Sequence, residues 1–353
     1  MAADFIAQLC ARVKDAAAAG TALRLRGGGT KDFYGNAPRG ETVEIGGYDG
    51  VVAYEPKELV LTVRAGTPLA EVEATLARER QMLPFEPPHF GAGRATIGGA
   101  VAAGLSGPRR PYAGAVRDFV LGARIVNGKG EDLSFGGRVI KNVAGYDVSR
   151  LMAGAMGTLG AITEVSFKVL PRPPSEMTLG YQMDEAAATA QVNAWAGQPL
   201  PVTATAWLGG RLLVRLAGAE SAVRAARVKM GGEEATDLPD FWSALRDHRI
   251  AFFAGEPALW RLSVPQATPP LGVGSTPLVE WGGGVRWLRG ALDADEVRSA
   301  AERAGGHATL FRGGERSGGV FHPLAPPLLK IHRRLKSAFD PAGIFNPGRL
   351  YDF

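Results

Sequence analysis

RGGGTKD, residues 26–32, directly follows a short predicted strand, ALRL at residues 22–25. Three successive glycines leave backbone N–H groups unshielded and permit positive φ angles, so the segment can form a concave nest for a diphosphate. Arg26 and Lys31 flank the glycines with positive charge, and the Thr30 hydroxyl can donate a hydrogen bond to a phosphate oxygen. Taken alone, the segment is also compatible with a glycine-rich hairpin turn.

Two familiar phosphate-binding loops do not match this region. A Walker loop ends in Gly-Lys-Ser/Thr, and residues 35–42 have its spacing but carry Glu41 where the lysine would stand. The dinucleotide-binding turn G-x-G-x-x-G opens a helix, and no helix is expected directly after Asp32. The glycine segment therefore has to be interpreted together with the rest of the chain.

Further segments combine glycine with other small residues. ATIGGAVAAG at residues 95–104 would let the backbone lie flat against a planar ring, although a tightly packed helix start explains it equally well. PYAGAVRD at residues 111–118, KNVAGYD at residues 141–147 and GAMGTLGAIT at residues 154–163 follow in order. In the last of these, GTLG precedes an apolar strand and places bare backbone next to a ligand.

Residues 1–172 predict a domain of short strands and glycine turns. A helix is expected over residues 68–80, with Thr67 as its N-cap, and a hairpin is expected around Asn127-Gly128. PRPP at residues 171–174 ends the domain, because no central strand contains such a stiff segment.

Residues 173–323 show a different pattern. Strand patterns alternate there with predicted helices over residues 184–196, 221–230 and 294–303, which indicates an antiparallel sheet with helices on one face. Residues 324–353 predict a helix and then a tail whose prolines and glycines fold it back. The fold class is therefore α+β, with a small antiparallel second domain.

Composition excludes several classes of protein and site. The single cysteine, Cys10, cannot form an intrachain disulfide, and one thiolate cannot hold an iron–sulfur cluster or a structural zinc. The five histidines lack ligand-type spacing, so no metal site is expected. A net charge of +5 without interleaved basic and aromatic residues does not support nucleic-acid binding. No apolar run reaches the ~18 residues that span a bilayer, and the amphipathic N-terminus differs from a signal peptide, so a cytoplasmic protein is expected.

In this order and spacing, the glycine-rich segments resemble the FAD-binding domain of the vanillyl-alcohol oxidase/para-cresol methylhydroxylase family over residues 20–172. FDPAGIFNPGRL at residues 339–350 is similar to the C-terminal return segment of that family. The resemblance implies a two-subdomain FAD-binding domain, a small antiparallel α+β cap domain at residues 173–323, and a segment at residues 324–353 that returns to the FAD-binding domain.

The resemblance also implies which residues bind FAD. Arg26–Lys31 would hold the pyrophosphate, Gly157–Ile162 would contact the ring and adenine side, and Asn346 would close the site from the tail. Covalently flavinylated members carry a histidine in the first glycine loop, where this chain has Gly29-Thr30, and His89 lies outside that loop. FAD is therefore expected to bind non-covalently. The implied contacts are Arg26, Gly27, Gly28, Gly29, Thr30, Lys31, Gly93, Thr96, Ile97, Gly98, Gly99, Ala103, Ser106, Gly157, Thr158, Gly160, Ile162 and Asn346.

Residues 137–173 and the short cap are most similar to the smaller flavin-binding subunits of bacterial glycolate oxidases. This implies oxidation of glycolate or a similar 2-hydroxy acid, with hydride passing to flavin N5 and electrons to an iron–sulfur subunit and quinone. The implied partners are that iron–sulfur subunit and a larger flavoprotein subunit. UDP-sugar reductases share the cradle type, but the cap has no evident sugar-nucleotide signature.

An FAD-loaded relay or assembly subunit is the alternative, with the substrate oxidised on the partner flavoprotein. Larger relatives that oxidise D-2-hydroxy acids carry His-Gly-Asp-Gly-Asn-x-His in the cap, and this chain does not. Arg109, Tyr112, Arg312 and His322 remain as candidate catalytic residues. A solvated arginine pair at residues 109–110 and a turn role for His322 are the plainer interpretations.

A basic stretch, Lys330 to Lys336, lies in the last predicted helix. Such a stretch is usually the solvated face of an amphipathic helix. It can also dock a partner subunit or an anionic membrane surface, which would place the protein at the inner face of the cytoplasmic membrane.

Overall fold

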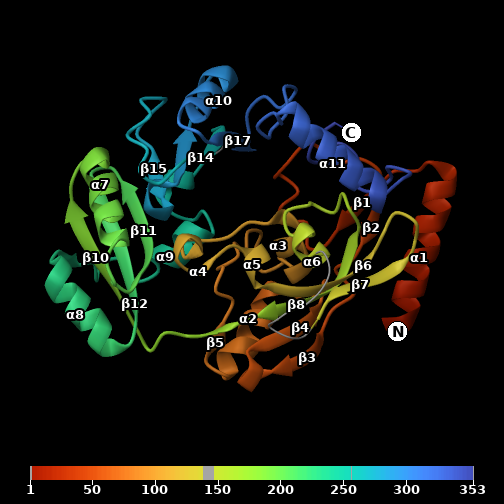
Figure 1. The fold of residues 1–353 in the computed structure, drawn as a ribbon, viewed down its shortest axis with the longest axis horizontal. Coiled ribbons are helices and arrows are strands. Elements are labelled where there is room, and N and C mark those ends of the chain that lie inside the picture. Colours follow the sequence, from red (N-terminus) through yellow and green to blue (C-terminus); the bar gives the residue numbers. More distant parts are fainter. Residues whose placement is uncertain (1, 138–146, 256, 353) are drawn as a thin grey trace. The chain divides into compact units, whose positions relative to one another are not determined.

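The computed structural model describes residues 2–137, 147–255 and 257–352. Most of the segment KNVAGYD lies outside these ranges. The chain divides into two compact units (Figure 1). The first unit comprises Met1–Ser106, Ala115–Pro171 and Pro323–Phe353, and the second comprises Gly107–Gly114 and Arg172–His322.

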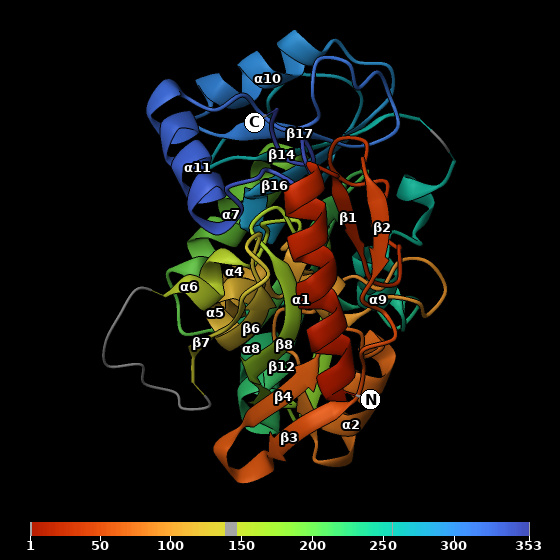
Figure 2. The ribbon, with the colours of Figure 1, turned by 90° about the vertical axis from the view of Figure 1, so that its right-hand side faces the viewer.

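The described residues of the first unit form three separate sheets. Strands β3, β4, β8, β6 and β7 form an antiparallel sheet in that order, β1 pairs in parallel with β2, and the short strands β5 and β9 pair antiparallel. Helix α1 lies beside β2, where Arg12 donates a hydrogen bond of 3.0 Å to the Thr42 carbonyl (Figure 2). The elements of this unit are α1 (Ala2–Ala19), β1 (Leu23–Arg26), β2 (Glu41–Glu44), β3 (Val51–Glu55), η1 (Pro56–Glu58), β4 (Val60–Arg64), α2 (Leu69–Arg78), β5 (Gln81–Met82), α3 (Ile97–Ala103), α5 (Val116–Phe119), β6 (Val120–Val126), β7 (Asp132–Gly136), α6 (Val148–Leu151), β8 (Ala161–Lys168), β9 (Leu170–Pro171) and α11 (Pro326–Phe339).

Helix α2 starts differently from the sequence prediction. Its N-cap is Pro68, and no side chain caps it. The hydroxyl of Thr67, the predicted cap, accepts from the Gly50 N–H at 2.9 Å and donates to the Arg64 carbonyl at 2.7 Å. The N-cap prediction was wrong because these two bonds of Thr67 join two loops instead.

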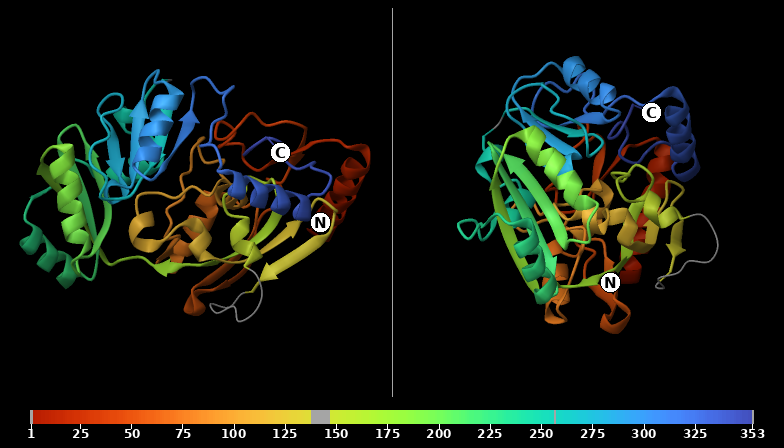
Figure 3. Two further views of the ribbon diagram at one scale, coloured as in Figure 1. Left: turned by 45° about the horizontal axis from the view of Figure 1, so that its top comes forward. Right: turned by 60° about the vertical axis from the view of Figure 1, so that its left-hand side comes forward.

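The second unit is an antiparallel sheet with α7, α8 and α10 on one face, so the predicted α+β fold is confirmed (Figure 3). The short helix α9 contacts the opposite face, where Trp242 bonds Thr178 and lies under Arg215, so the helices are not confined to one face as the sequence predicted. Cross-strand partners share a face. The row Trp207–Val279–Arg286–Leu262–Ala308 therefore lies on one side, where α7, α8 and α10 pack. The elements are α4 (Arg110–Ala113), β10 (Ser175–Gln182), α7 (Glu185–Ala196), β11 (Val202–Leu208), β12 (Arg211–Gly218), α8 (Glu220–Met230), β13 (Glu233–Glu234), α9 (Phe241–Arg246), η2 (Ala251–Phe253), β14 (Leu259–Ser263), β15 (Leu278–Glu280), η3 (Trp281–Gly283), β16 (Val285–Arg289), α10 (Ala294–Arg303) and β17 (His307–Arg312).

Residues 107–114 group with the second unit although their neighbours in sequence belong to the first. The Arg110 guanidinium lies over the Trp281 ring, 4.5 Å from its centroid. Arg109 is 7% exposed and pairs with Glu176 at 3.7 Å. Cation–π and ionic contacts of this kind are invisible in the local sequence, which gave no reason to separate this segment from the first domain.

A buried ion pair holds the C-terminal tail against the rest of the first unit. Lys336 Nζ lies 2.6 Å from Asp340 Oδ2 and donates to the carbonyls of Thr158 and Phe345 at 2.9 and 2.7 Å. Asp340 in turn accepts from the N–H groups of Ile344 and Phe345. The pKa of Lys336 is lowered overall, mainly because burial disfavours the charged form, although the Asp340 carboxylate opposes this shift. Lys336 is therefore not part of the solvated basic face that the sequence suggested.

Replacing Lys336 by Met should destabilise the protein by about 3–5 kcal/mol, because it leaves the Asp340 charge buried without its partner. Lys330→Met is the matched control, since Lys330 is exposed on the same helix. Urea denaturation followed by far-UV circular dichroism measures both variants, because all six tryptophans lie in the second unit and would not report on the first. A Lys336→Met protein within about 0.5 kcal/mol of the wild type would contradict the role given to the pair.

Candidate functional site

Two adjoining cavities lie in the first unit. The apolar cavity has a volume of about 450 Å³ and the basic cavity about 590 Å³. The two share a wall made of Leu25, Arg26, Gly27, Thr96, Gly99, Ala102, Met156 and Asn346. A long ligand with a planar end and a charged middle could extend through both.

The first glycine loop is held by backbone packing. A Cβ on Gly28 would lie 1.5 Å from the Arg94 carbonyl oxygen, and one on Gly27 would lie 2.4 Å from the Thr96 hydroxyl. Gly29 has a φ of +67°, which disfavours other residues. These glycines are thus required for two loops to approach each other and leave the cavity wall free of side chains.

Helix α3 begins at the same wall. The Thr96 hydroxyl caps it by accepting from the Gly99 N–H at 3.2 Å. Gly98 packs so tightly on β4 that an added Cβ would lie 2.6 Å from the Ala65 Cβ. The small residues of this segment therefore serve both as a helix start and as a flat cavity wall, and the two interpretations of the sequence were not exclusive.

The opposite wall comes from the loop before β8 and from the tail. Asn346 donates to the Met156 carbonyl at 2.7 Å and accepts from the Leu25 N–H at 2.9 Å. Gly157 has a φ of +71°, and a Cβ there would lie 2.6 Å from the Asn346 amide nitrogen. One side chain thus joins β1, this loop and the tail around the apolar cavity.

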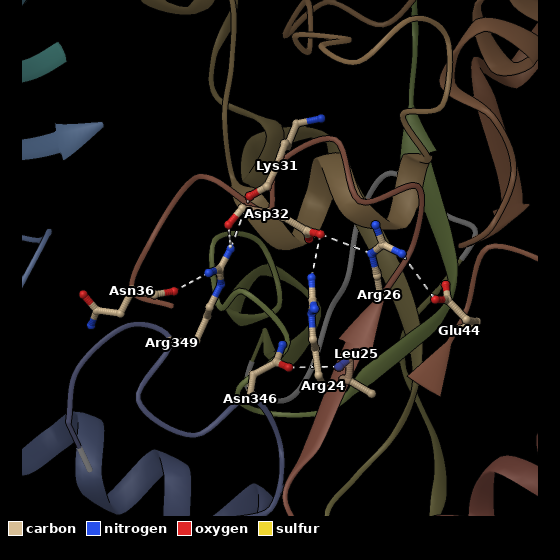
Figure 4. A network of polar contacts seen from close by, with 9 residues as sticks. All are labelled: Arg24, Leu25, Arg26, Lys31, Asp32, Asn36, Glu44, Asn346 and Arg349. Atoms are coloured by element: carbon tan, nitrogen blue, oxygen red, sulfur yellow. Dashed lines mark hydrogen bonds and ion pairs between the residues drawn. The ribbon is translucent and has the colours of Figure 1, made fainter. Parts of the chain in front are cut away.

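Charged side chains surround the basic cavity (Figure 4). Arg24 and Arg26 both contact Asp32 Oδ2, at 2.6 and 3.1 Å, and Arg26 also lies 3.5 Å from Glu44. Arg349 donates to the carbonyls of Lys31, Asp32 and Asn36 and so clamps the loop. Four cationic side chains and one carboxylate line the cavity, which favours an anionic group such as a diphosphate. The charged lining residues are Arg24, Arg26, Lys31, Arg349 and Asp32.

Most of the predicted FAD contacts line these cavities. The apolar cavity is lined by Arg26, Gly27, Thr96, Gly98, Gly99, Gly157, Gly160, Ile162 and Asn346. The basic cavity adds Gly28, Gly29, Thr30, Lys31 and Ala103. Both cavities also contain residues that the sequence did not single out, namely Arg24, Asp32, Ile45, Ala65, Met156 and Arg349.

Four predicted contacts lie elsewhere in the first unit. Ile97 is fully buried, and the Thr158 hydroxyl donates to the Ala155 carbonyl at 2.7 Å. The Ser106 hydroxyl accepts from the N–H group that opens α5, at 3.2 Å. Gly93 has a φ of +80° in an exposed turn. Their side chains or backbone support the cavity walls rather than forming them.

All four catalytic candidates belong to the second unit, where each has a different partner. Arg109 pairs with Glu176, and His322 Nε2 lies 3.0 Å from Glu302 Oε1. Arg312 donates to the Phe253 carbonyl at 2.9 Å, and burial followed by the nearby Arg289 charge lowers its pKa.

Tyr112 lines a separate cavity of about 650 Å³ with uncharged walls. The ring is 36% exposed, but its hydroxyl bonds with Thr205, and burial raises its pKa. The candidate residues thus have structural partners in the second unit, and their catalytic roles stay predictions.

Glu280 is a buried carboxyl group that the sequence did not reveal. It is 6% exposed and accepts from the Trp287 indole N–H at 2.6 Å. Burial raises its pKa to about 7, against the opposing effects of that hydrogen bond and the Arg261 charge. No local pattern marks it, because Glu280 ends a strand like any polar residue and its burial depends on distant parts of the chain.

The described residues show neither a metal-binding cluster nor a membrane-spanning helix. No group of three or more His, Cys, Asp or Glu in residues 2–137, 147–255 and 257–352 could hold a metal ion. In the same ranges, no helix is both long and apolar enough to cross a bilayer.

Comparison with known sequences gives clear relatives. A model of FAD binding domains matches residues 2–136, and a model of the C-terminal domain of FAD linked oxidases matches residues 323–350. The glycolate oxidase subunit GlcE of Escherichia coli (strain K12) is 45% identical over 99% of this chain and 98% of its own length. The glycolate oxidase subunit GlcD of Bacillus subtilis (strain 168) is 31% identical over 50% of this chain and 38% of its own.

Solved structures share the fold. p-Cresol methylhydroxylase superposes with a TM-score of 0.73 at 15% identity, over 98% of this chain and 87% of that one. Alkyldihydroxyacetonephosphate synthase gives 0.67 at 16% identity, over 96% and 74%. The predicted vanillyl-alcohol oxidase/para-cresol methylhydroxylase fold is therefore confirmed.

The chain belongs to the family of glycolate oxidase subunit GlcE, and it is an FAD-dependent oxidoreductase. The cavities fit this cofactor, since the apolar cavity has bare, glycine-lined walls for a planar ring and the basic cavity has cations for a diphosphate. Non-covalent binding is consistent with Gly29 and Thr30 at the loop where covalent members carry histidine.

Gly28→Val should weaken FAD binding at least about tenfold, because the new side chain collides with the Arg94 carbonyl and displaces one cavity wall. Gly47→Ala is the control, since Gly47 is exposed with nothing within 4 Å of an added Cβ. FAD content is read from the visible absorbance of purified protein, and the rise in Tm on adding FAD gives a second readout. Full FAD content in Gly28→Val would count against the cavity assignment.

Glu280 should make stability depend on pH. Between its ordinary pKa of 4.5 and the raised value of about 7, the folded protein binds more protons here than the unfolded chain. The free energy of unfolding therefore falls as pH rises through this window, by at most about 3 kcal/mol for this group. Glu280→Gln should abolish that fall while keeping an acceptor for Trp287.

Urea denaturation of wild type and Glu280→Gln at several pH values across this window measures the effect. Glu233→Gln, at an exposed strand position of the same unit, should follow the wild-type profile. Identical profiles for Glu280→Gln and wild type would show that the Glu280 carboxyl keeps its ordinary pKa.

Proposed function

We propose that this chain is the FAD-carrying subunit of a complex that oxidises glycolate or a similar 2-hydroxy acid. The observation that carries the proposal is the pair of adjoining cavities in the first unit, one glycine-lined and one basic, in a chain that matches a glycolate oxidase subunit along its whole length. The residues that would hold FAD are the glycine loop with Arg26 and Lys31, the start of α3, the Gly157 loop and Asn346.

When bound, FAD supplies a hydride acceptor at N5 and single-electron release, so the proposed path runs from the substrate α-carbon to an iron–sulfur subunit and quinone. The chain has one cysteine, so clusters of thiolate-bound iron belong to another subunit. The proposed partners are that iron–sulfur subunit and a larger flavoprotein subunit. We place the complex in the cytoplasm, with a peripheral position at the membrane if a partner provides it.

The second unit offers cations for a substrate carboxylate. Arg289 and Arg312 both pair in register with Leu259, from the strands on either side of it. Burial, and after it the nearby positive charge of Arg289, lowers the pKa of Arg312. A carboxylate bound between two guanidinium groups would relieve their repulsion and could form bidentate hydrogen bonds. We therefore propose Arg312 as the carboxylate-binding candidate, with Arg109, Tyr112 and His322 as weaker ones.

A relay or assembly subunit is the second candidate function, with substrate oxidised on the partner flavoprotein. The observation that favours it is the engagement of the predicted catalytic side chains, because Arg109 pairs with Glu176 and His322 with Glu302. A side chain already held in an ion pair is a poor proton acceptor for a substrate hydroxyl.

Adding glycolate or D-lactate anaerobically to the purified chain tests these functions. Direct oxidation predicts loss of the oxidised flavin absorbance with the isolated chain, and at least tenfold slower loss for Arg312→Ala. Arg303→Ala, at an exposed position of the same unit, is the control and should react like wild type.

Bleaching only after the partner subunits are added would support the relay instead. A purified chain without any flavin absorbance would rule out both candidate functions.

A further inference from the structure

Helix α11 exposes apolar side chains. Leu328 is 50% and Ile331 52% exposed. No other helix in the described parts of the chain exposes two large apolar side chains to this degree. Isolated exposed hydrophobic residues are normal, but a pair one turn apart on one helix is a contiguous apolar surface.

The apolar residues of this helix have a regular spacing. Leu335 is partly exposed and lies four residues after Ile331, which itself follows Leu328 by three residues. Positions spaced by three and four residues lie on one side of a helix. They form a narrow stripe of the kind that fits an apolar groove on another protein.

The outer surface of α11 is also basic. Lys330, Arg333 and Arg334 are exposed, and the helix contains no aspartate or glutamate. The fourth cation, Lys336, points inward to Asp340. Positive charge thus lies beside the stripe at Arg334, three residues after Ile331, and no acidic side chain of the helix offsets the three exposed cations.

This surface is connected to the cavities by direct bonds. Lys336 donates to the Thr158 carbonyl in the loop whose Gly157 lines the apolar cavity. The tail after α11 carries Asn346, which also lines that cavity. A protein bound to α11 would therefore lie against the segment that fixes two walls of the FAD site.

We propose that the outer face of α11, formed by Leu328, Ile331 and Leu335 with the exposed cations Lys330, Arg333 and Arg334, docks a protein subunit that presents an apolar groove bordered by carboxylates. The proposal rests on the proposed function, in which this chain works within a complex, and it specifies the surface that binds the partner. The partner's carboxylates complement the three exposed cations, and its groove accommodates the apolar stripe.

A protein partner fits this face better than an anionic membrane. An interfacial helix immerses its apolar face by about 5–10 Å in the bilayer. Among the described residues of α11, Leu328 and Ile331 are the exposed large apolar side chains, each by about half, so the helix presents a narrow stripe rather than the broad apolar face that immersion needs. Three cations alone contribute about 1 kcal/mol each at an anionic surface, which is too little for stable attachment.

Co-expression of the full chain with the two proposed partner subunits tests the docking face. The double variant Leu328→Glu with Ile331→Glu would place charge in the partner's apolar groove, while glutamate preserves the helix because it has a high helix propensity. The matched control is Val51→Glu with Val52→Glu, an exposed apolar pair (39% and 37%) in the same unit. A second variant, Arg333→Glu with Arg334→Glu, reverses the charge and is matched by Lys57→Glu with Arg78→Glu, both exposed.

The yield of partner subunits that co-purify with the tagged chain should fall at least tenfold for both α11 variants. It should stay at the wild-type level for both controls. FAD content and Tm should be unchanged in all four variants, which separates docking from folding. Wild-type yield with both α11 variants would overturn the docking face.

Two other outcomes would also overturn the proposal. If the wild-type chain recovers no partner subunit, the proposed complex itself fails. If the isolated chain co-floats with phosphatidylglycerol vesicles and the Arg333→Glu/Arg334→Glu variant does not, the face is a membrane surface.

Discussion

The FAD site depends on how Asn346 joins three segments that are far apart in sequence. Its side chain bonds the Leu25 N–H and the Met156 carbonyl, and its own N–H bonds the Leu23 carbonyl. The strand before the glycine loop, the loop before β8 and the tail are thereby fixed to one another. Because Asn346 is 6% exposed, each of these backbone groups would otherwise be buried without a partner. The walls of the apolar cavity keep their separation for this reason.

The tail reaches this position through a second buried interaction. Lys336 and Asp340 form an ion pair whose remaining bonds all go to the backbone of the same region. A buried pair gives little net stability compared with well-packed apolar residues, but loss of either partner is costly. Its main contribution here is geometry, since it fixes the turn between α11 and the tail. The cofactor site and the surface of α11 are therefore parts of one connected structure.

The sequence predicted those parts of the site that depend on local backbone geometry. Gly28 and Gly157 were recognisable because close approach or a positive φ admits little else. Contacts between distant segments were not predictable. The burial of Lys336 depends on loops more than 100 residues away, and the grouping of residues 107–114 with the second unit depends on Trp281 and Glu176. Thr67 was assigned to a cap because the loop that binds its hydroxyl gives no signal near it.

The two units therefore differ in what substitution can change. In the first unit, glycine backbone forms much of the cavity walls, so many side chains can vary while the cavities persist. This explains why proteins of very different sequence share the fold, and why fold alone says little about the substrate. In the second unit, arginines and aromatic rings border the sheet face opposite the helices, and each position alters charge directly. On the proposed function, substitutions in the second unit should therefore affect substrate choice through side chains, and those in the first unit should affect cofactor binding through the backbone.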